Sequence, residues 1–167
     1  MKKIKLIKTV LLLLFVAFAF SNCEEDGAIQ FVVVDDFETN ASVSGLEGLS
    51  SIDITRDINI SDLLDNVSTF VEADVESVII TLNDYDGDSI EGNFSCSIGG
   101  ISLFNQALEL IPGTATNPIA IPSSVSSILS SIESGNVQVQ LTGSTNSPIA
   151  DDDFSLNLKI KVKAKVE

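Results

Sequence analysis

The chain has 167 residues, of which 24 are acidic, 9 are Lys or Arg and none is His, and its formal charge is -15. This length fits one domain or at most two small ones. Without a histidine, a Ser-His-Asp or Cys-His catalytic site and a histidine-bearing zinc site are excluded. Nucleic-acid binding is disfavoured because phosphate backbones are held by clustered Lys and Arg, and this chain is strongly acidic.

The first 22 residues have the pattern of a secretory signal. Four lysines precede an uninterrupted apolar run from Val10 to Phe20, and Cys23 follows closely. A charged start, a short apolar core and a polar exit are typical of a cleaved signal peptide. A transmembrane helix needs roughly 20 apolar residues, and this run ends too early for one.

Residues 20–23 read Phe-Ser-Asn-Cys and resemble a bacterial lipobox, in which the cysteine becomes the first mature residue and carries acyl chains. The usual lipobox has Leu three places before the cysteine and Gly, Ala or Ser directly before it, whereas this chain has Phe20 and Asn22. Looser motifs of this kind resemble those of Bacteroidota lipoproteins. The resemblance implies palmitate-type lipidation of Cys23, and several acyl chains hold a protein on a membrane far more tightly than one.

Three acids directly after this cysteine, Glu24, Glu25 and Asp26, resemble the signal that sends lipoproteins of that phylum to the outer face of the outer membrane. The alternative is that they only keep a tether soluble. We therefore expect a signal peptide at 1–22, a lipidated tether with an acidic export signal at 23–28, and one domain at 29–167 facing the cell exterior. Cleavage removes four bases and no acid, which leaves a charge of -19.

Strand signals dominate the exported part, because β-branched residues alternate with polar ones between turns rich in Gly, Asn, Asp and Pro. We predict an all-β, immunoglobulin-like antiparallel sandwich of about seven or eight strands. The segment 83–93, with Asp86-Gly87, is predicted to be a long hairpin loop. The predicted strands are 29–34, 52–60, 75–82, 94–98, 101–104, 108–111, 137–142 and 154–166.

Two further segments, 61–71 and 122–134, have apolar residues at helical spacing. Each apolar stripe is narrow, and a serine or aspartate is available to cap each start. We expect two short helices that cover open ends of the sandwich, in preference to helices that bind a partner.

The final segment, 154–166, alternates apolar residues with a row of four lysines, Lys159, Lys161, Lys163 and Lys165. This pattern predicts a strand with one buried face and one solvent-exposed face. The lysines could dock an acidic partner, block edge-to-edge pairing or be neutralised by acids on neighbouring strands. Because Asp53 and Asp57 lie on the wet face of 52–60, we predict that these two segments pair.

Arg56 falls in phase with the isoleucines of its predicted strand. Either a bulge turns the side chain outward or its guanidinium meets a buried acid, and the bulge is the prediction. Cys96 is in phase with Phe94 and Ile98, so we expect a buried small hydrophobe and not a reactive nucleophile. If Cys23 is acylated, no intramolecular disulfide is possible.

The main candidate metal site is the acidic loop, residues 84–91. Alternate acids on a loop can bring oxygen ligands together on calcium. The pattern resembles the start of an EF-hand loop, but Ser89 stands where Gly is needed and Ser95 where Glu is needed, so a true EF-hand is rejected. A different calcium site, with residues 151–153 from a second loop, stays open against an acidic turn that is merely solvated. The candidate ligands are Asp84, Asp86, Asp88 and Glu91.

Residues 88–90, Asp-Ser-Ile, also resemble the O-glycosylation signal of Bacteroidota, which implies a sugar on Ser89. Paired carboxylates could in principle make a glycosidase, but sugar sites are usually lined with aromatic rings. The chain has no Trp and one Tyr, which disfavours both a glycosidase and a carbohydrate-binding module.

We therefore expect a surface lipoprotein that is not an enzyme and acts as an accessory, adhesive or structural interaction module. The alternative is a calcium- or glycan-binding accessory lipoprotein of an outer-membrane uptake system. We expect no required cofactor, calcium being the one ion considered. The expected partners are the membrane, through Cys23, and an unidentified protein or glycan, with no nucleic acid.

Overall fold

A computed structural model describes residues 31–59, 70–133 and 136–166. Within these ranges nearly all of the regular secondary structure is strand, as predicted. None of the described helical residues forms a span of the length and hydrophobicity that a bilayer requires. In chain order the elements are β1 (Phe31–Ser44), β2 (Ser51–Asn59), β3 (Phe70–Asn83), β4 (Ile90–Ile98), β5 (Ile101–Leu110), β6 (Ile119–Ala120), α3 (Leu129–Glu133), β7 (Asn136–Thr145) and β8 (Asp153–Val166).

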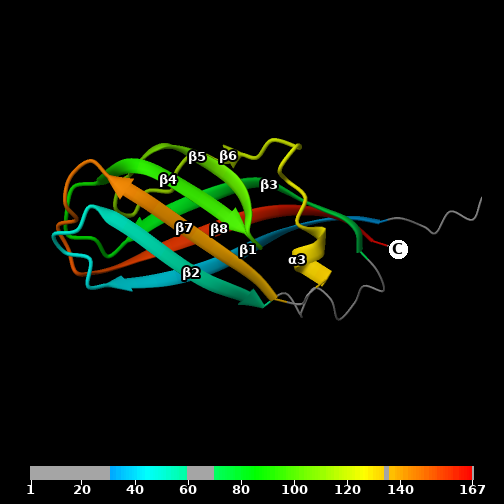
Figure 1. The fold of residues 1–167 in the computed structure, drawn as a ribbon, viewed down its shortest axis with the longest axis horizontal. Coiled ribbons are helices and arrows are strands. Elements are labelled where there is room, and N and C mark those ends of the chain that lie inside the picture. The colour runs from blue at the N-terminus through cyan, green and yellow to red at the C-terminus, as the bar shows by residue number, and fades with distance from the viewer. Residues whose placement is uncertain (1–30, 60–69, 134–135, 167) are drawn as a thin grey trace, which may run out of the picture.

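The strands form two four-stranded sheets, with orders β1-β8-β3-β6 and β2-β7-β4-β5, and every pairing is antiparallel. Figure 1 shows the sheets as two stacked layers. Apolar side chains at alternate positions fill the space between them, including the fully buried Phe94 and Leu156. The prediction of an antiparallel β-sandwich is confirmed.

Close packing between neighbouring strands explains a glycine in the middle of β7, where Gly143 is directly opposite Phe94 of β4. A Cβ atom on Gly143 would lie 2.8 Å from Cδ1 of Phe94, well inside normal contact distance. The ring of Phe94 therefore occupies the space that a side chain at 143 would need. Such close approach is a common reason for glycine within a strand.

The predicted pairing of 52–60 with 154–166 is wrong. β8 is a central strand between β1 and β3, and β2 pairs with β7. Acids facing the lysines are present on β1 and β3 as well, so charge alone could not identify the neighbour of β8. Because β8 is central, its lysines do not protect a sheet edge.

The segment 83–93 is not a hairpin loop. β3 and β4, which it joins, belong to different sheets, so the segment crosses from one layer to the other. The predicted strands 101–104 and 108–111 are one strand, β5, with a register shift opposite Cys96 and Ser97. A bulge and the outward Ala107 interrupt the apolar pattern there without ending the strand.

The helix predicted over 122–134 is shorter than expected. Only Leu129–Glu133 is helical, and α3 packs against β3 and β7 through the buried Ile132. The preceding residues bond to β3 instead, since the Ile128 amide donates to Ala73 O at 2.8 Å and the Val75 amide to Ser126 O at 2.9 Å. Of the helix predicted over 61–71, residues 61–69 lie outside the described residues. The last two, Phe70 and Val71, begin β3.

The bulge predicted at Arg56 is absent, because the β2–β7 register runs unbroken through Arg56 and Val139. The side chain is nevertheless exposed, and its guanidinium donates to Thr55 O at 2.9 Å and to Ser42 O at 3.0 Å. β2 is an edge strand, so a long side chain in inward phase can reach past the edge of the sheet to β1. The edge position, and not a bulge, keeps the charge in water.

Candidate functional site

The lysine row of β8 is neutralised by acids on its two neighbouring strands. Lys159 Nζ lies 2.9 Å from Asp36 and 3.6 Å from Glu38, both on β1. The hydrogen bond to Asp36, followed by the charge of Asp36, raises the pKa of Lys159. On the β3 side, Lys161 pairs with Glu76 at 3.0 Å and Lys165 with Glu72 at 2.7 Å. Of the three alternatives for the lysine row, neutralisation by neighbouring acids therefore applies to three of the four lysines, with acids of β1 and β3 and not of 52–60.

Tyr85 anchors the acidic loop to the core. The ring is 8% exposed and meets the Phe154 ring edge-on, with centroids 5.4 Å apart at 79°. Its hydroxyl accepts a hydrogen bond from the Ala150 amide at 3.0 Å. The only tyrosine of the chain is thus a structural anchor between two loops. Sequence reasoning identified its rarity but not this role, which depends on a contact across 65 residues.

Asp151 joins the same two loops. Its Oδ2 accepts from the Asp86 amide at 2.9 Å, and its Oδ1 accepts from the Asp153 amide at 3.1 Å. The bond from Asp86, followed by that from Asp153, lowers the pKa of Asp151, because amide donors favour the charged carboxylate. The calcium hypothesis combined the 84–91 and 151–153 segments, and the two segments meet here through a hydrogen bond. They are joined by the Asp151 carboxylate, which accepts hydrogen bonds from backbone amides.

The four candidate calcium ligands do not converge in the described structure. Asp84 has a positive φ of 58° and accepts from Ser155 Oγ at 3.5 Å, while Asp86 and Asp88 are exposed. Glu91 lies on the outer face of β4. Among the described residues, no three acidic, His or Cys side chains are arranged to hold a metal ion.

The remaining predicted sites are Ser89, Cys96 and the N-terminal lipidation and export residues. Ser89 is half-buried in the acidic loop. Cys96 is 1% exposed, as predicted, and burial raises the pKa of its thiol to about 12, so the thiolate is scarce at neutral pH. The proposed lipidation site Cys23 and the acids Glu24, Glu25 and Asp26 lie outside the described residues.

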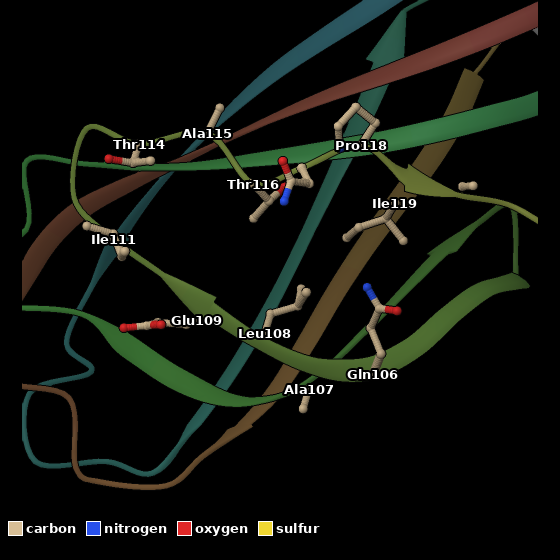
Figure 2. Close-up of a pocket in the computed structure, with 12 residues that line it drawn as sticks. Gln106, Ala107, Leu108, Glu109, Ile111, Thr114, Ala115, Thr116, Pro118 and Ile119 are labelled. Carbon is tan, nitrogen blue, oxygen red and sulfur yellow. The ribbon is translucent and has the colours of Figure 1, made fainter.

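A groove of about 600 Å³ opens along β5, and sequence reasoning did not find it. Figure 2 shows Gln106 and Leu108 of β5 pointing toward Ile119, while Ala107 points away. We call this space the β5 groove. It is lined by Gln106, Ala107, Leu108, Glu109, Ile111, Thr114, Ala115, Thr116, Asn117, Pro118, Ile119 and Ala120.

The β5 groove exists because the two sheets end differently on this side. Gln106 and Leu108 are opposite Phe94 and Gly92, which places them in the inward phase of β4 and β5. In the facing sheet, the last strand, β6, has only two residues. The inner face of β5 therefore has no full strand across from it, and the sandwich stays open.

The segment 111–121 covers the edge of β3 on the far side of the groove. The Gly113 amide donates to Leu82 O at 2.7 Å and the Thr116 amide to Ile80 O at 2.9 Å. Thr116 Oγ1 accepts from the Ile80 amide at 3.0 Å. β5, in contrast, is the last strand of its sheet and pairs only with β4 among the described strands. One wall of the groove is thus a closed edge and the other an open edge.

Comparison with protein-family models and with curated proteins found no match. Among solved structures, the chain is similar to a chain of infectious bursal disease virus Gx strain, at 13% identity and TM-score 0.34, covering 85% of this chain and 32% of that one. The Gt strain gives 12% identity and TM-score 0.30, covering 85% and 34%. Dimeric latent PorU from Porphyromonas gingivalis gives 13% identity and TM-score 0.27, covering 84% and 14%. This chain spans about a third or less of each, and likenesses this weak carry no functional argument.

Proposed function

We propose that this chain is a non-catalytic surface lipoprotein, anchored to the outer membrane through acyl chains on Cys23, that acts as an interaction module. The basic start, the apolar run and Cys23 support the anchor, and the acids that follow support the outward-facing location. The immunoglobulin-like character of the sandwich is part of this proposal, supported by the antiparallel order of its two sheets.

The observation that carries the interaction role is the β5 groove beside an open sheet edge. Loops and edges held by a rigid scaffold are where binding surfaces usually lie. Two polar features have structural roles here, since three of the four lysines of β8 are in ion pairs within the sheet and Tyr85 anchors a loop. The chain also lacks histidine, which removes the commonest general base.

The anchor is tested with labelled palmitate in cells that make the full chain. We expect label in the wild type and none in Cys23→Ser, because only a cysteine at the start of the mature chain receives the acyl chains. A triple change of Glu24, Glu25 and Asp26 to Ala is the matched control. It should keep the label while reducing labelling by a membrane-impermeant reagent. Equal palmitate incorporation in wild type and Cys23→Ser would contradict the proposal.

Calcium or glycan binding in an uptake system is the alternative function. The contact between the Asp86 amide and Asp151 favours calcium, because it brings two acidic loops together. The carboxylates would have to turn toward one another to hold the ion. An ion bound only by the folded state raises the melting temperature. Overlapping melts in calcium and in chelator would remove this alternative.

A further inference from the structure

The four edge strands of the sandwich differ in how they are protected against pairing with another chain. Exposed edges invite such pairing, and proteins block them with charges, prolines or very short strands. β1 carries Asp36 and Glu38, and β2 carries Asp53, Arg56 and Asp57. β6 has two residues and lies between Pro118 and Pro122. Three edges are therefore protected.

β5 has none of these protections over most of its length. Its ten residues include no proline and one charged residue, Glu109. Its register shift lies near its start, and from Phe104 to Leu110 it pairs with β4 without interruption. A long, regular and nearly uncharged edge is the kind that accepts an added strand.

We propose that the outer edge of β5 binds an extended segment of another protein as an added β-strand, with a Lys or Arg facing Glu109. Alternate side chains of the segment enter the β5 groove, and the others face solvent. This inference rests on the proposed interaction function and names the site and the chemistry of the partner.

The preference for a basic residue comes from two facing glutamates. Glu91 on β4 is directly opposite Glu109 on β5, and both are exposed. Like charges in directly opposed positions destabilise a sheet. Among the residues that the structure describes, neither carboxylate has an ion-pair partner. A cation on an added strand beside Glu109 would relieve this repulsion, and the charge of -15 would attract it from a distance.

The groove indicates what the alternate side chains should be. Leu108 and Ile119 face each other across it, and Ile111 at its end is 44% exposed. Burying these apolar groups against a partner is favourable. The amide of Gln106 also points into the groove and gives the incoming segment one polar contact. We therefore expect small or medium apolar residues at alternate positions of the bound segment.

A second copy of this chain does not fit the site as well. Its own β5 has no Lys or Arg to face Glu109. The strand that carries a lysine row, β8, is paired on both sides and has no free edge to offer. The charge favours a strand from a different, basic segment.

The test selects peptides against the full chain in detergent from a displayed library of about ten residues, the length of a long strand. The selected peptides should alternate apolar and polar residues, with a Lys or Arg at one fixed position. Glu109→Lys should weaken their binding roughly tenfold, the scale of reversing one ion pair. Glu133→Lys, an exposed position on α3, makes the same charge change and should have no effect. Melting curves verify that both variants fold.

Methylated peptides separate strand addition from simple charge attraction. Two versions of a selected peptide carry N-methyl groups on one or the other alternate set of residues. An added strand turns only one set of its amides toward β5, so one version should lose binding and the other keep it. Equal binding of both versions overturns the proposal, as does a selection whose peptides are insensitive to Glu109→Lys. If sedimentation instead shows self-association that Ala107→Lys abolishes, the occupant is a second copy and the proposal is wrong. Palmitate labelling is independent of all these results, so failure of this site and failure of the lipoprotein assignment are distinguishable.

Discussion

The two sides of the sandwich at which the sheets end differ in how their edge strands are protected against pairing with another chain. On one side the edges of β1 and β2 carry charged residues, and Arg56 reaches from β2 to Ser42 O on β1. On the other side, at the top of Figure 1, β5 faces a two-residue strand across a groove. The charged side discourages a further strand. The groove side has an edge with a single charge, and this contrast marks it as the binding side.

The largest effect we expect comes from loosening the closed wall of the groove with Thr116→Val. The change removes the hydroxyl that accepts from the Ile80 amide at 3.0 Å. A partly buried amide without a partner should cost about 1–2 kcal/mol in free energy of unfolding, measured with urea. Thr114→Val is the control, because Thr114 is exposed and the change leaves its backbone amide bonded to Ile111 O. Equal losses in the two variants would show that the Thr116 hydroxyl does not hold the wall.

A smaller effect should follow from Arg56→Ala on the charged side. This variant loses two hydrogen bonds to backbone oxygens, both exposed to water, so we expect a loss of about 0.5–1 kcal/mol in urea unfolding. Peptide binding at β5 should be unchanged, since Arg56 is on the opposite side. The control is Lys163→Ala, an exposed base on the outer face of β8. Comparable losses for the two bases would remove the special role given to Arg56.

The smallest effect concerns the loop end that joins the two sheets, where backbone amides lower the pKa of Asp151. A carboxyl with a pKa lower in the folded than in the unfolded state stabilises the fold above the unfolded pKa, and this contribution is lost as pH falls through the folded pKa. Asp151→Asn should therefore be less stable than wild type near neutral pH, and the difference in free energy of unfolding should shrink as the pH falls below the usual pKa of Asp and through the lowered pKa of Asp151. Urea unfolding across this range measures it.

The neighbouring Asp152→Asn removes one negative charge from the same loop and serves as the control. It leaves the two bonds that Asp86 and Asp153 donate to Asp151 in place. If the difference in free energy of unfolding between wild type and Asp151→Asn stays constant with pH, the bonded carboxylate is not its cause.

The positions of strands were predictable from the sequence wherever one face of the strand is exposed to solvent. The alternation in 154–166 gave β8 nearly residue for residue, and Cys96 was correctly assigned to the core from its phase. Neighbours were much less predictable. Several strands present acids on a wet face, so the partner of the lysine row could not be chosen from charge, and the predicted pairing with 52–60 was wrong.

The candidate site was likewise predictable only in part, because its residues could be found in the sequence but their spatial arrangement could not. The calcium hypothesis combined the acids at 84–91 and 151–153, and these segments meet, but their geometry depends on the anchor that Tyr85 provides with Phe154 and Ala150. The β5 groove left no motif in the sequence. The one available signal is negative, a ten-residue strand with a single charge, and it becomes meaningful only once β5 is known to be an edge.

The amino-acid order by itself determined the secretory and lipobox-like pattern, the dominance of strands and which face of most strands is buried, because these depend on residues next to or two places from one another. Only the tertiary structure decided which strands are central and which lie at edges, how the acidic loops meet, and where the sandwich stays open. Those features depend on contacts between residues far apart in the chain, and their energies depend on packing as well as on local pattern.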